Sequence, residues 1–345
     1  MRANHQRIAI RLDGRYRRDI LPAMTAVQDT AAGFQSGALT AGRSLRQIIW
    51  ARLRRDRVAM ICLIVLIVYY AIGILGPFIV ANPSGTFDKT AISDLGGKPF
   101  GDWGGISAAH PLGVEWGTGR DIMAQLMFGL RISLIIATSA TAITVTIGTV
   151  VGIIAGYSGG WTDMVIGRFM DLVLAFPFIL IILALSNVLT QRLTQLGVPE
   201  GNPSRITYLI LVLSVFGWPY LARIVRGQVI SLREREFVEA AVAMGSTKRR
   251  ILFTEILPNL WAPILVYATL TLPAYIGLEA ALSFLGVGVL PPETTFGAML
   301  ANSVSYFNVV PTYLFIPGTV LVILVVSFNL LGDSLRDALD PKAIH

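Results

Sequence analysis

Six long apolar segments without charged side chains constrain most strongly how this chain can fold. A run of about 20 apolar residues is long enough to cross the hydrocarbon core of a bilayer as a helix. The segments that reach or approach this length without Asp, Glu, Lys or Arg are 58–87, 132–162, 172–191, 206–222, 256–278 and 294–332. Barrel strands would be shorter and would alternate in polarity. The sequence therefore predicts an all-α polytopic membrane protein with six transmembrane helices.

The distribution of lysine and arginine predicts the orientation of these helices. Positively charged residues prefer short cytoplasmic loops. Segments 1–57 and 223–255 hold most of the 28 lysines and arginines, whereas segment 284–312 holds none. Both the N- and the C-terminus are therefore expected to be cytoplasmic. We attribute the net charge of +7 to this topology and expect contact with membrane lipid, not with nucleic acid.

Composition also predicts how the chain is organised. Residues 43–57 place apolar side chains at helical spacing between arginines, which is typical of a helix lying at the membrane interface. Segment 294–310 could form a marginal seventh span, but it is short and more polar than its neighbours, so we expect a short re-entrant or interfacial helix on the outer side. The expected parts are a weakly ordered cytoplasmic tail (1–42), the interfacial helix (43–57), transmembrane helix 1 (58–80), an external loop (81–130), transmembrane helices 2–6 (131–333) with a short cytoplasmic helix near 234–250, and a cytoplasmic C-terminus (334–345).

The sequence lacks the common signatures of catalytic and metal sites. It contains no GxxxxGK[ST] phosphate loop and no HExxH. One cysteine, Cys62, and three scattered histidines predict neither a disulfide nor a metal cluster. We expect no catalytic residue and no cofactor or metal bound by this chain, so ATP-driven work would need an ATPase on another chain.

Charged and small residues in the spans support further expectations. A carboxylate within a membrane span is costly, so Glu279 is expected either to bond to a neighbouring helix or to line a translocation path. Arg168 and Asp171 share a helix face and predict an ion pair. Small residues in the second span, such as Gly152, indicate either close packing inside the bundle or a moving interface with a second subunit.

The polar stretch 234–258 predicts a short surface helix joined to two spans. Glutamates followed by a run of alanine, valine and methionine favour a helix. Gly245 supplies either a left-handed stop or a place for close backbone approach, and Ser246 or Thr247 can cap a second helix. A small-residue face on such a helix suits docking into a groove of a cytoplasmic partner.

Five stretches in order resemble the permease subunits of bacterial ABC importers. Glu239-Ala240-Ala241, Gly245 and Leu257-Pro258 resemble the EAA loop, and Glu255 replaces its usual isoleucine, as is common among peptide importers. The other four stretches are HPLGVEWGTGRDIMAQLMFGLRISL at 110–134, DLVLAFP at 171–177, LSFLGVGVLPPETTFGAML at 282–300 and NLLGDSLRDALDP at 329–341. Glu115, Trp116 and Phe296 depart from the family pattern. Over residues 45–341 the chain resembles the dipeptide/oligopeptide (and nickel) transport family, and within it the C-type permease.

This resemblance implies a type I ABC-importer (MetI-like) permease core in a bacterial plasma (inner) membrane. It implies a heterodimer with a homologous permease, two cytoplasmic ABC ATPases that bind ATP and Mg, and an external binding protein that delivers di- or oligopeptides. The chain itself would not be an enzyme. Glu279 would be the candidate for the translocation path. The residues implied to couple to the ATPase are Glu239, Ala240, Ala241, Gly245, Leu257 and Pro258.

Other functions are compatible with parts of this pattern. Related permeases carry nickel complexes, glutathione or oligosaccharides, and the sequence does not specify the solute. A carrier or channel that works without ATP would need ion-coupling charges inside the membrane and inverted repeats. Neither is evident in the sequence, so the ATP-driven permease is the preferred interpretation.

Overall fold

The computed structural model describes residues 50–80, 87–94 and 96–339. The chain divides into two units, Met1–Arg52 and Leu53–His345. Of the first unit only residues 50–52 are described, and they are helical. The predicted tail at 1–42 and residues 43–49 of the predicted interfacial helix at 43–57 lie outside the described residues. All that follows concerns the second unit.

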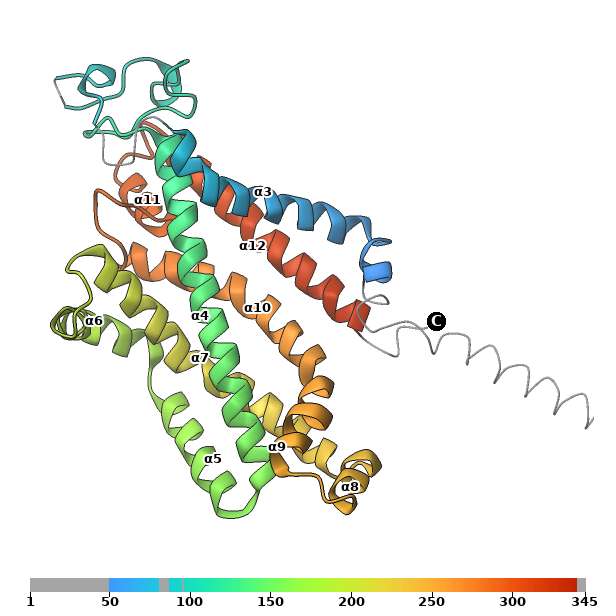
Figure 1. Cartoon of the computed structure of the whole chain (residues 1–345). Coiled ribbons are helices and arrows are strands. Elements are labelled where there is room, and N and C mark those ends of the chain that lie inside the picture. The colour runs from blue at the N-terminus through green and yellow to red at the C-terminus, as the bar shows by residue number, and fades with distance from the viewer. Residues whose placement is uncertain (1–49, 81–86, 95, 340–345) are drawn as a thin grey trace, which may run out of the picture. The chain divides into compact units, whose positions relative to one another are not determined.

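Six helices among the described residues are long and apolar enough to cross a membrane, which confirms the predicted number. Helix α4 begins before the predicted core boundary at 131, because Asp121 caps it through a 2.7 Å bond from the Ala124 amide. The six are α3 (Arg57–Ile79), α4 (Ile122–Ser158), α6 (Phe178–Gln195), α7 (Asn202–Arg233), the continuous segment Lys248–Phe284 that ends in α10 (Leu257–Phe284), and α12 (Thr312–Leu339) (Figure 1).

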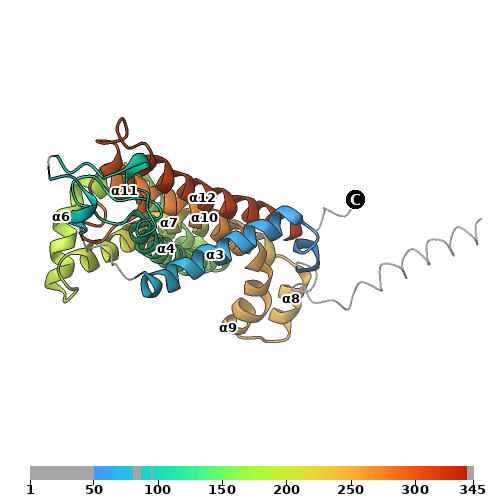
Figure 2. The same cartoon turned by 90° about the horizontal axis from the view of Figure 1, so that it is seen from above.

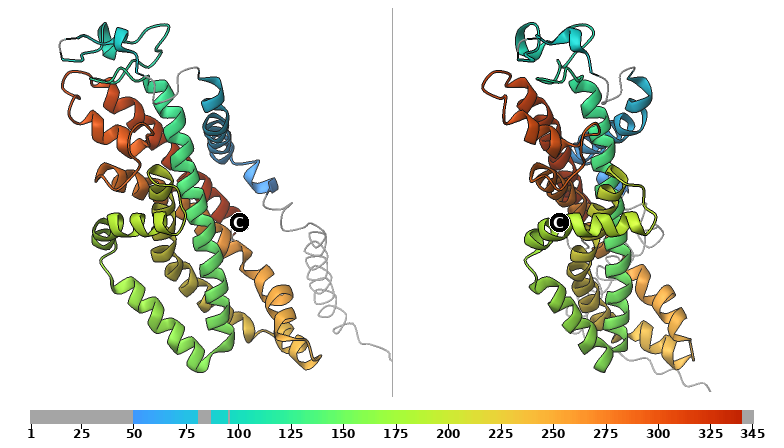
Figure 3. Two further views of the ribbon diagram at one scale, coloured as in Figure 1. Left: turned by 60° about the vertical axis from the view of Figure 1, so that its left-hand side comes forward. Right: turned by 90° about the vertical axis from the view of Figure 1, so that its left-hand side faces the viewer.

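Shorter elements connect these helices. On one side of the membrane helices lie the loop 87–121, with the one-turn helices η1 (Lys89–Ala91) and η2 (Asp102–Gly104), and α11 (Phe296–Ser303). At the opposite end of α4 lie α8 (Glu236–Ala243) and α9 (Lys248–Arg250), as Figures 1 and 3 show. The remaining elements are α5 (Gly160–Ala175) and the π-helical turn η3 (Ile251–Ile256).

Helix α11 occupies the segment that the sequence predicted to hold a short helix. It spans 8 residues and is capped by Thr295, whose hydroxyl accepts a bond from the Ala298 amide. Helix α11 packs against α10 and α12, and Phe296 is fully buried. An eight-residue helix cannot cross a bilayer, so no seventh span arises here.

Helix α4 is the central element of the second unit. It packs along α7 and also against α3 and α10, while α3 and α12 lie side by side (Figures 1 and 2). Three glycines of α4 at four-residue spacing face α7. A Cβ atom at Gly148, Gly152 or Gly156 would lie 3.0, 2.7 or 2.8 Å from a carbonyl oxygen of α7. These glycines therefore serve packing within the chain, as small residues do where helices must approach closely.

Ion pairs join α5 to α7 and differ from the predicted pair. Arg226 of α7 donates two bonds to Asp163 of α5, one of them 2.7 Å long. Arg223 donates to Asp171 at 2.5 Å. The predicted pair between Arg168 and Asp171 is wrong, because α7 runs beside α5 and supplies the guanidinium that Asp171 binds.

The contact between α4 and α7 makes a testable prediction. Gly152→Ala should lower the free energy of unfolding by about 1–3 kcal/mol, because its Cβ overlaps the Ala222 carbonyl oxygen. Gly227→Ala is the matched control on an open face of α7; it should raise stability by about 0.5–1 kcal/mol, since alanine suits a helix interior better than glycine. Denaturant titration in detergent measures both, and equal effects would contradict the contact.

Candidate functional site

Helix α8 is a short helix with a sharply defined end. The Gly245 amide donates to the Val242 carbonyl at 2.9 Å, and the Ser246 amide donates to the Ala241 carbonyl at 3.0 Å. Gly245 has φ of +76°. This is the Schellman arrangement, in which a left-handed glycine closes a helix. Of the two roles predicted for Gly245, a left-handed stop or a place of close backbone approach, the left-handed stop is present.

The six residues predicted to couple divide between an exposed and a buried surface. Glu239, Ala240 and Gly245 are exposed, as is Pro258. Ala241 is only 4% exposed and packs into its own chain, so it is not available to fill a groove in a partner. Leu257 is half-buried at the beginning of α10.

The outer face of α8 also exposes large apolar side chains that the sequence analysis did not single out. Phe237, Val242 and Met244 are 40, 55 and 79% exposed. We define the α8 surface as Phe237, Glu239, Ala240, Val242 and Met244. Large apolar side chains exposed on a short helix outside the six candidate spans are compatible with a protein-binding surface. In the sequence, the positions of Phe237, Val242 and Met244 on either side of Ala240 and Ala241 were the sign of this exposed surface.

The inner face of α8 is anchored to the beginning of the next membrane helix. Val238 and Ala241 share a cluster of buried side chains with Ile251, Ile256 and Leu260. Val238 is 2% exposed, and Ile256 and Leu260 are fully buried. A displacement of α8 must therefore act on the segment that leads into α10.

Glu279 lies in a closed environment within the helix bundle. Its side chain is fully buried. It accepts bonds from the hydroxyls of Ser133 on α4 and Ser283 on α10, both at 2.7 Å. These contacts favour the interpretation that Glu279 bonds to a neighbouring helix, because its carboxyl group reaches no surface of this chain.

The loop 87–121 contains a buried ion pair that the sequence analysis noted only as a departure from a motif. Arg120 Nη2 donates to Glu115 at 2.9 Å, and the hydroxyls of Tyr313 and Thr118 donate to the same carboxylate at 2.8 and 2.6 Å. Arg120 also donates to the Pro292 carbonyl at 3.3 Å. Burial raises the pKa of Glu115. The hydrogen bonds and charge of Arg120, together with the bonds from Thr118 and Tyr313, outweigh burial, so the pKa of Glu115 lies below its ordinary value. The pair ties the loop to α12 and to the segment after α10.

A second polar cluster fixes the same loop to the first turn of α4. His110 Nδ1 lies 2.7 Å from the carboxylate of Asp121, and Nε2 lies 3.2 Å from that of Asp88. Burial of the imidazole ring disfavours its charged form, but the two carboxylates outweigh this effect and raise the pKa of His110. The histidine of the HPLG stretch thus holds two parts of the loop together.

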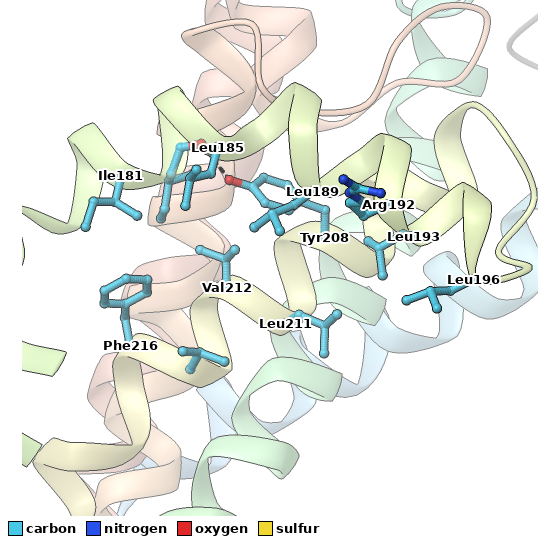
Figure 4. A pocket seen from close by; sticks show the side chains of 12 residues that line it. Ile181, Leu185, Leu189, Arg192, Leu193, Leu196, Tyr208, Leu211, Val212 and Phe216 are labelled. Carbon is cyan, nitrogen blue, oxygen red and sulfur yellow. Dashed lines mark hydrogen bonds between the residues drawn. The ribbon is translucent and has the colours of Figure 1, made fainter. Parts of the chain in front are cut away.

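A cavity of about 340 Å³ lies between α6 and α7, and Figure 4 shows its lining. Its side chains are apolar except for Arg192 and for Tyr208, whose hydroxyl donates to the Ile182 carbonyl at 2.5 Å. Ligand sites normally combine an apolar lining with several converging polar groups. This cavity lacks such groups and is not assigned as a solute site. Among the described residues no group of His, Cys, Asp and Glu is arranged to hold a metal ion.

Two protein-family descriptions match this chain. The family described as "Binding-protein-dependent transport system inner membrane component" matches residues 148–345, which is more than half of the chain. The chain belongs to this family. The "N-terminal TM domain of oligopeptide transport permease C" matches residues 44–94. The chain is accordingly a permease component of an ABC importer and a multi-pass membrane protein.

Curated relatives cover most of this permease. The oligopeptide transport system permease protein OppC of Haemophilus influenzae is 36% identical over 307 residues, with 87% of this chain and 90% of the relative covered. The dipeptide transport system permease protein DppC of Alkalihalophilus pseudofirmus is 36% identical, with 84% and 88% covered.

A solved structure supports the fold. The inward-facing MetNI methionine ABC transporter matches with a TM-score of 0.50 at 20% identity, covering 64% of this chain and 98% of its own. The all-helical, MetI-like fold expected from the sequence is thereby confirmed. At this level of identity the match concerns the fold alone.

The environment of His110 makes stability depend on pH. Its raised pKa means that the folded state gains stability below the ordinary value of 6.5 and loses this gain as pH rises through the folded-state pKa. Relative to His110→Gln, the wild-type protein should therefore become less stable across the pH range in which a histidine titrates. Thermal unfolding in detergent at a series of pH values measures this. Parallel stability curves for the two proteins would contradict it.

Proposed function

We propose that this chain is one of two homologous permease subunits of an ATP-driven importer of di- or oligopeptides. The family match supports the permease role. The substrate class is supported by the relatives OppC and DppC, which are named for oligopeptide and dipeptide transport and align over 84% or more of this chain. Uptake of labelled peptides by a strain that depends on this subunit tests the substrate. Uptake of nickel complexes, glutathione or oligosaccharides instead would reject peptides and keep the permease role.

The observation that carries the coupling role is the α8 surface. It lies at the end of the second unit opposite the loop 87–121 (Figure 3). Helix α8 is connected directly to α7 and packs on η3, which leads into α10. We infer that this surface docks on a cytoplasmic ATPase subunit, which binds ATP and Mg. Closure of two ATPases would then move α8 and, through it, the two membrane helices to which it is joined.

The partner within the membrane is proposed from helix α6. Only 6% of the most apolar 18-residue stretch of α6 is buried by the rest of this chain, which is the lowest share among the six membrane helices. Its exposed surface includes the polar side chains of Asn187 and Gln191, which are costly against lipid. A second permease and the path between the subunits would give these side chains polar surroundings. The loop 87–121 and α11, at the opposite end to α8, are the proposed contact for an external binding protein.

Substitution at the end of α8 tests the coupling surface. Gly245→Asp should abolish uptake and ATPase coupling while the protein still inserts, because a charged side chain would project into the ATPase contact. Glu239→Lys should act in the same way by reversing a charge.

The control for Gly245→Asp is Gly160→Asp. Gly160 is also exposed, has φ of +56° and has open space around it, but it begins α5, which packs against α4 and α7. Both substitutions carry the same backbone cost of about 1–2 kcal/mol. Uptake assays normalised to membrane protein should separate them, and normal uptake by a well-inserted Gly245→Asp variant would reject the assignment.

Purification tests the assembly itself. Detergent extraction of the tagged chain should bring down a second permease and ATPase subunits, and the complex in liposomes should accumulate peptide only with ATP. An ATP-independent carrier would instead purify alone and transport in liposomes without ATP.

A further inference from the structure

The connection between α8 and the membrane contains an unusual turn. After the Thr247 cap, α9, η3 and α10 form one continuous helical segment, Lys248–Phe284. Its Ile251–Ile256 portion is π-helical, and the Leu257 amide donates to the carbonyl of Leu252, five residues earlier. Turns of this type are rare, occur mostly as single insertions within α-helices, and are frequent at functional sites.

The sequence immediately after this turn explains why it forms. Pro258 has no amide hydrogen, so the Thr254 carbonyl loses the donor that an α-helix would provide. The side-chain amide of Asn259 donates to the Glu255 carbonyl at 2.6 Å. Pro258 stands in the first turn of α10, so the missing amide falls at the end of the π turn. Pro258 and Asn259 together therefore favour the wider turn and satisfy one of the carbonyl groups that it leaves.

The two sides of the turn have different surroundings. Ile251 and Ile256 are buried against the inner face of α8. Phe253 and Thr254, on the other side, are exposed, so the turn has room to change its shape outward. Movement of α8 would thus push on the buried side of η3, whereas the opposite side of η3 is exposed.

We propose that η3 is the joint at which displacement of α8 becomes rotation of α10, with Pro258 and Asn259 as the positioning residues that hold it. A π turn contains one residue more than an α turn, and each residue of an α-helix contributes about 100° of rotation and about 1.5 Å of rise. Moving the additional residue along the segment rotates α10 relative to α8 without breaking the helix. This inference rests on the proposed coupling function.

The experiment uses the complete complex in liposomes and compares Pro258→Ala and Asn259→Ala with wild type. Both variants should assemble with the ATPase subunits and hydrolyse ATP, whereas peptide uptake per ATP should fall about fivefold or more. Pro263→Ala is the matched control, because Pro263 lies inside α10 and outside the π turn; its uptake per ATP should equal that of wild type.

A distance measurement adds a readout that does not depend on transport. Spin labels at exposed Glu236, which lies on α8 outside the defined α8 surface, and at exposed Leu265 on α10 should report a change on ATP binding in wild type and a smaller change in Pro258→Ala.

Three results would contradict the proposal that η3 is this joint. They are unchanged uptake per ATP in Pro258→Ala, an equal loss in Pro263→Ala, and a parallel fall in assembly and hydrolysis, which would indicate a purely structural role. A wild-type complex that transports without ATP would contradict the proposed function itself, and this result is read separately from the comparison of variants.

Discussion

The close approach of α4 and α7 is the contact on which the rest of the molecule depends. Without water to drive association, helices in a membrane gain stability from close packing of their surfaces. The glycines of α4 bring its backbone against that of α7, and the ion pairs from Asp163 and Asp171 then join α5 to the same helix. Because α7 leads directly into α8, the proposed docking surface is attached to the helix with the largest buried share among the six membrane helices. A force applied at α8 would therefore be transmitted to α7 and to the helices that pack against α7.

The features that were predictable from sequence are those that depend on local pattern. Uncharged runs identified the six spans because the bilayer imposes a length on any helix that crosses it. The stop at Gly245 was predictable because a left-handed residue at a helix end favours glycine. Both depend on residues that lie within a few positions of one another.

Features that depend on tertiary partners could not be derived in this way. Asp171 binds Arg223 and not Arg168, and only the arrangement of α5 beside α7 decides between them. Glu115 was visible only as an unusual residue in a motif, because its partner Tyr313 is distant in the chain. The π turn was missed for a different reason: a proline after a helical stretch predicts a lost hydrogen bond but not how the backbone adjusts to it.

The engagement of Glu115 and Arg120 removes two charges from the surface of the loop 87–121. Glu115 accepts bonds from Arg120, Thr118 and Tyr313, and the guanidinium of Arg120 also donates to the Pro292 carbonyl. Both side chains are buried, and their opposite charges neutralise each other. A carboxylate or a guanidinium that faced solvent would attract solutes of opposite charge. A charged group that approaches this part of the loop meets neither of them.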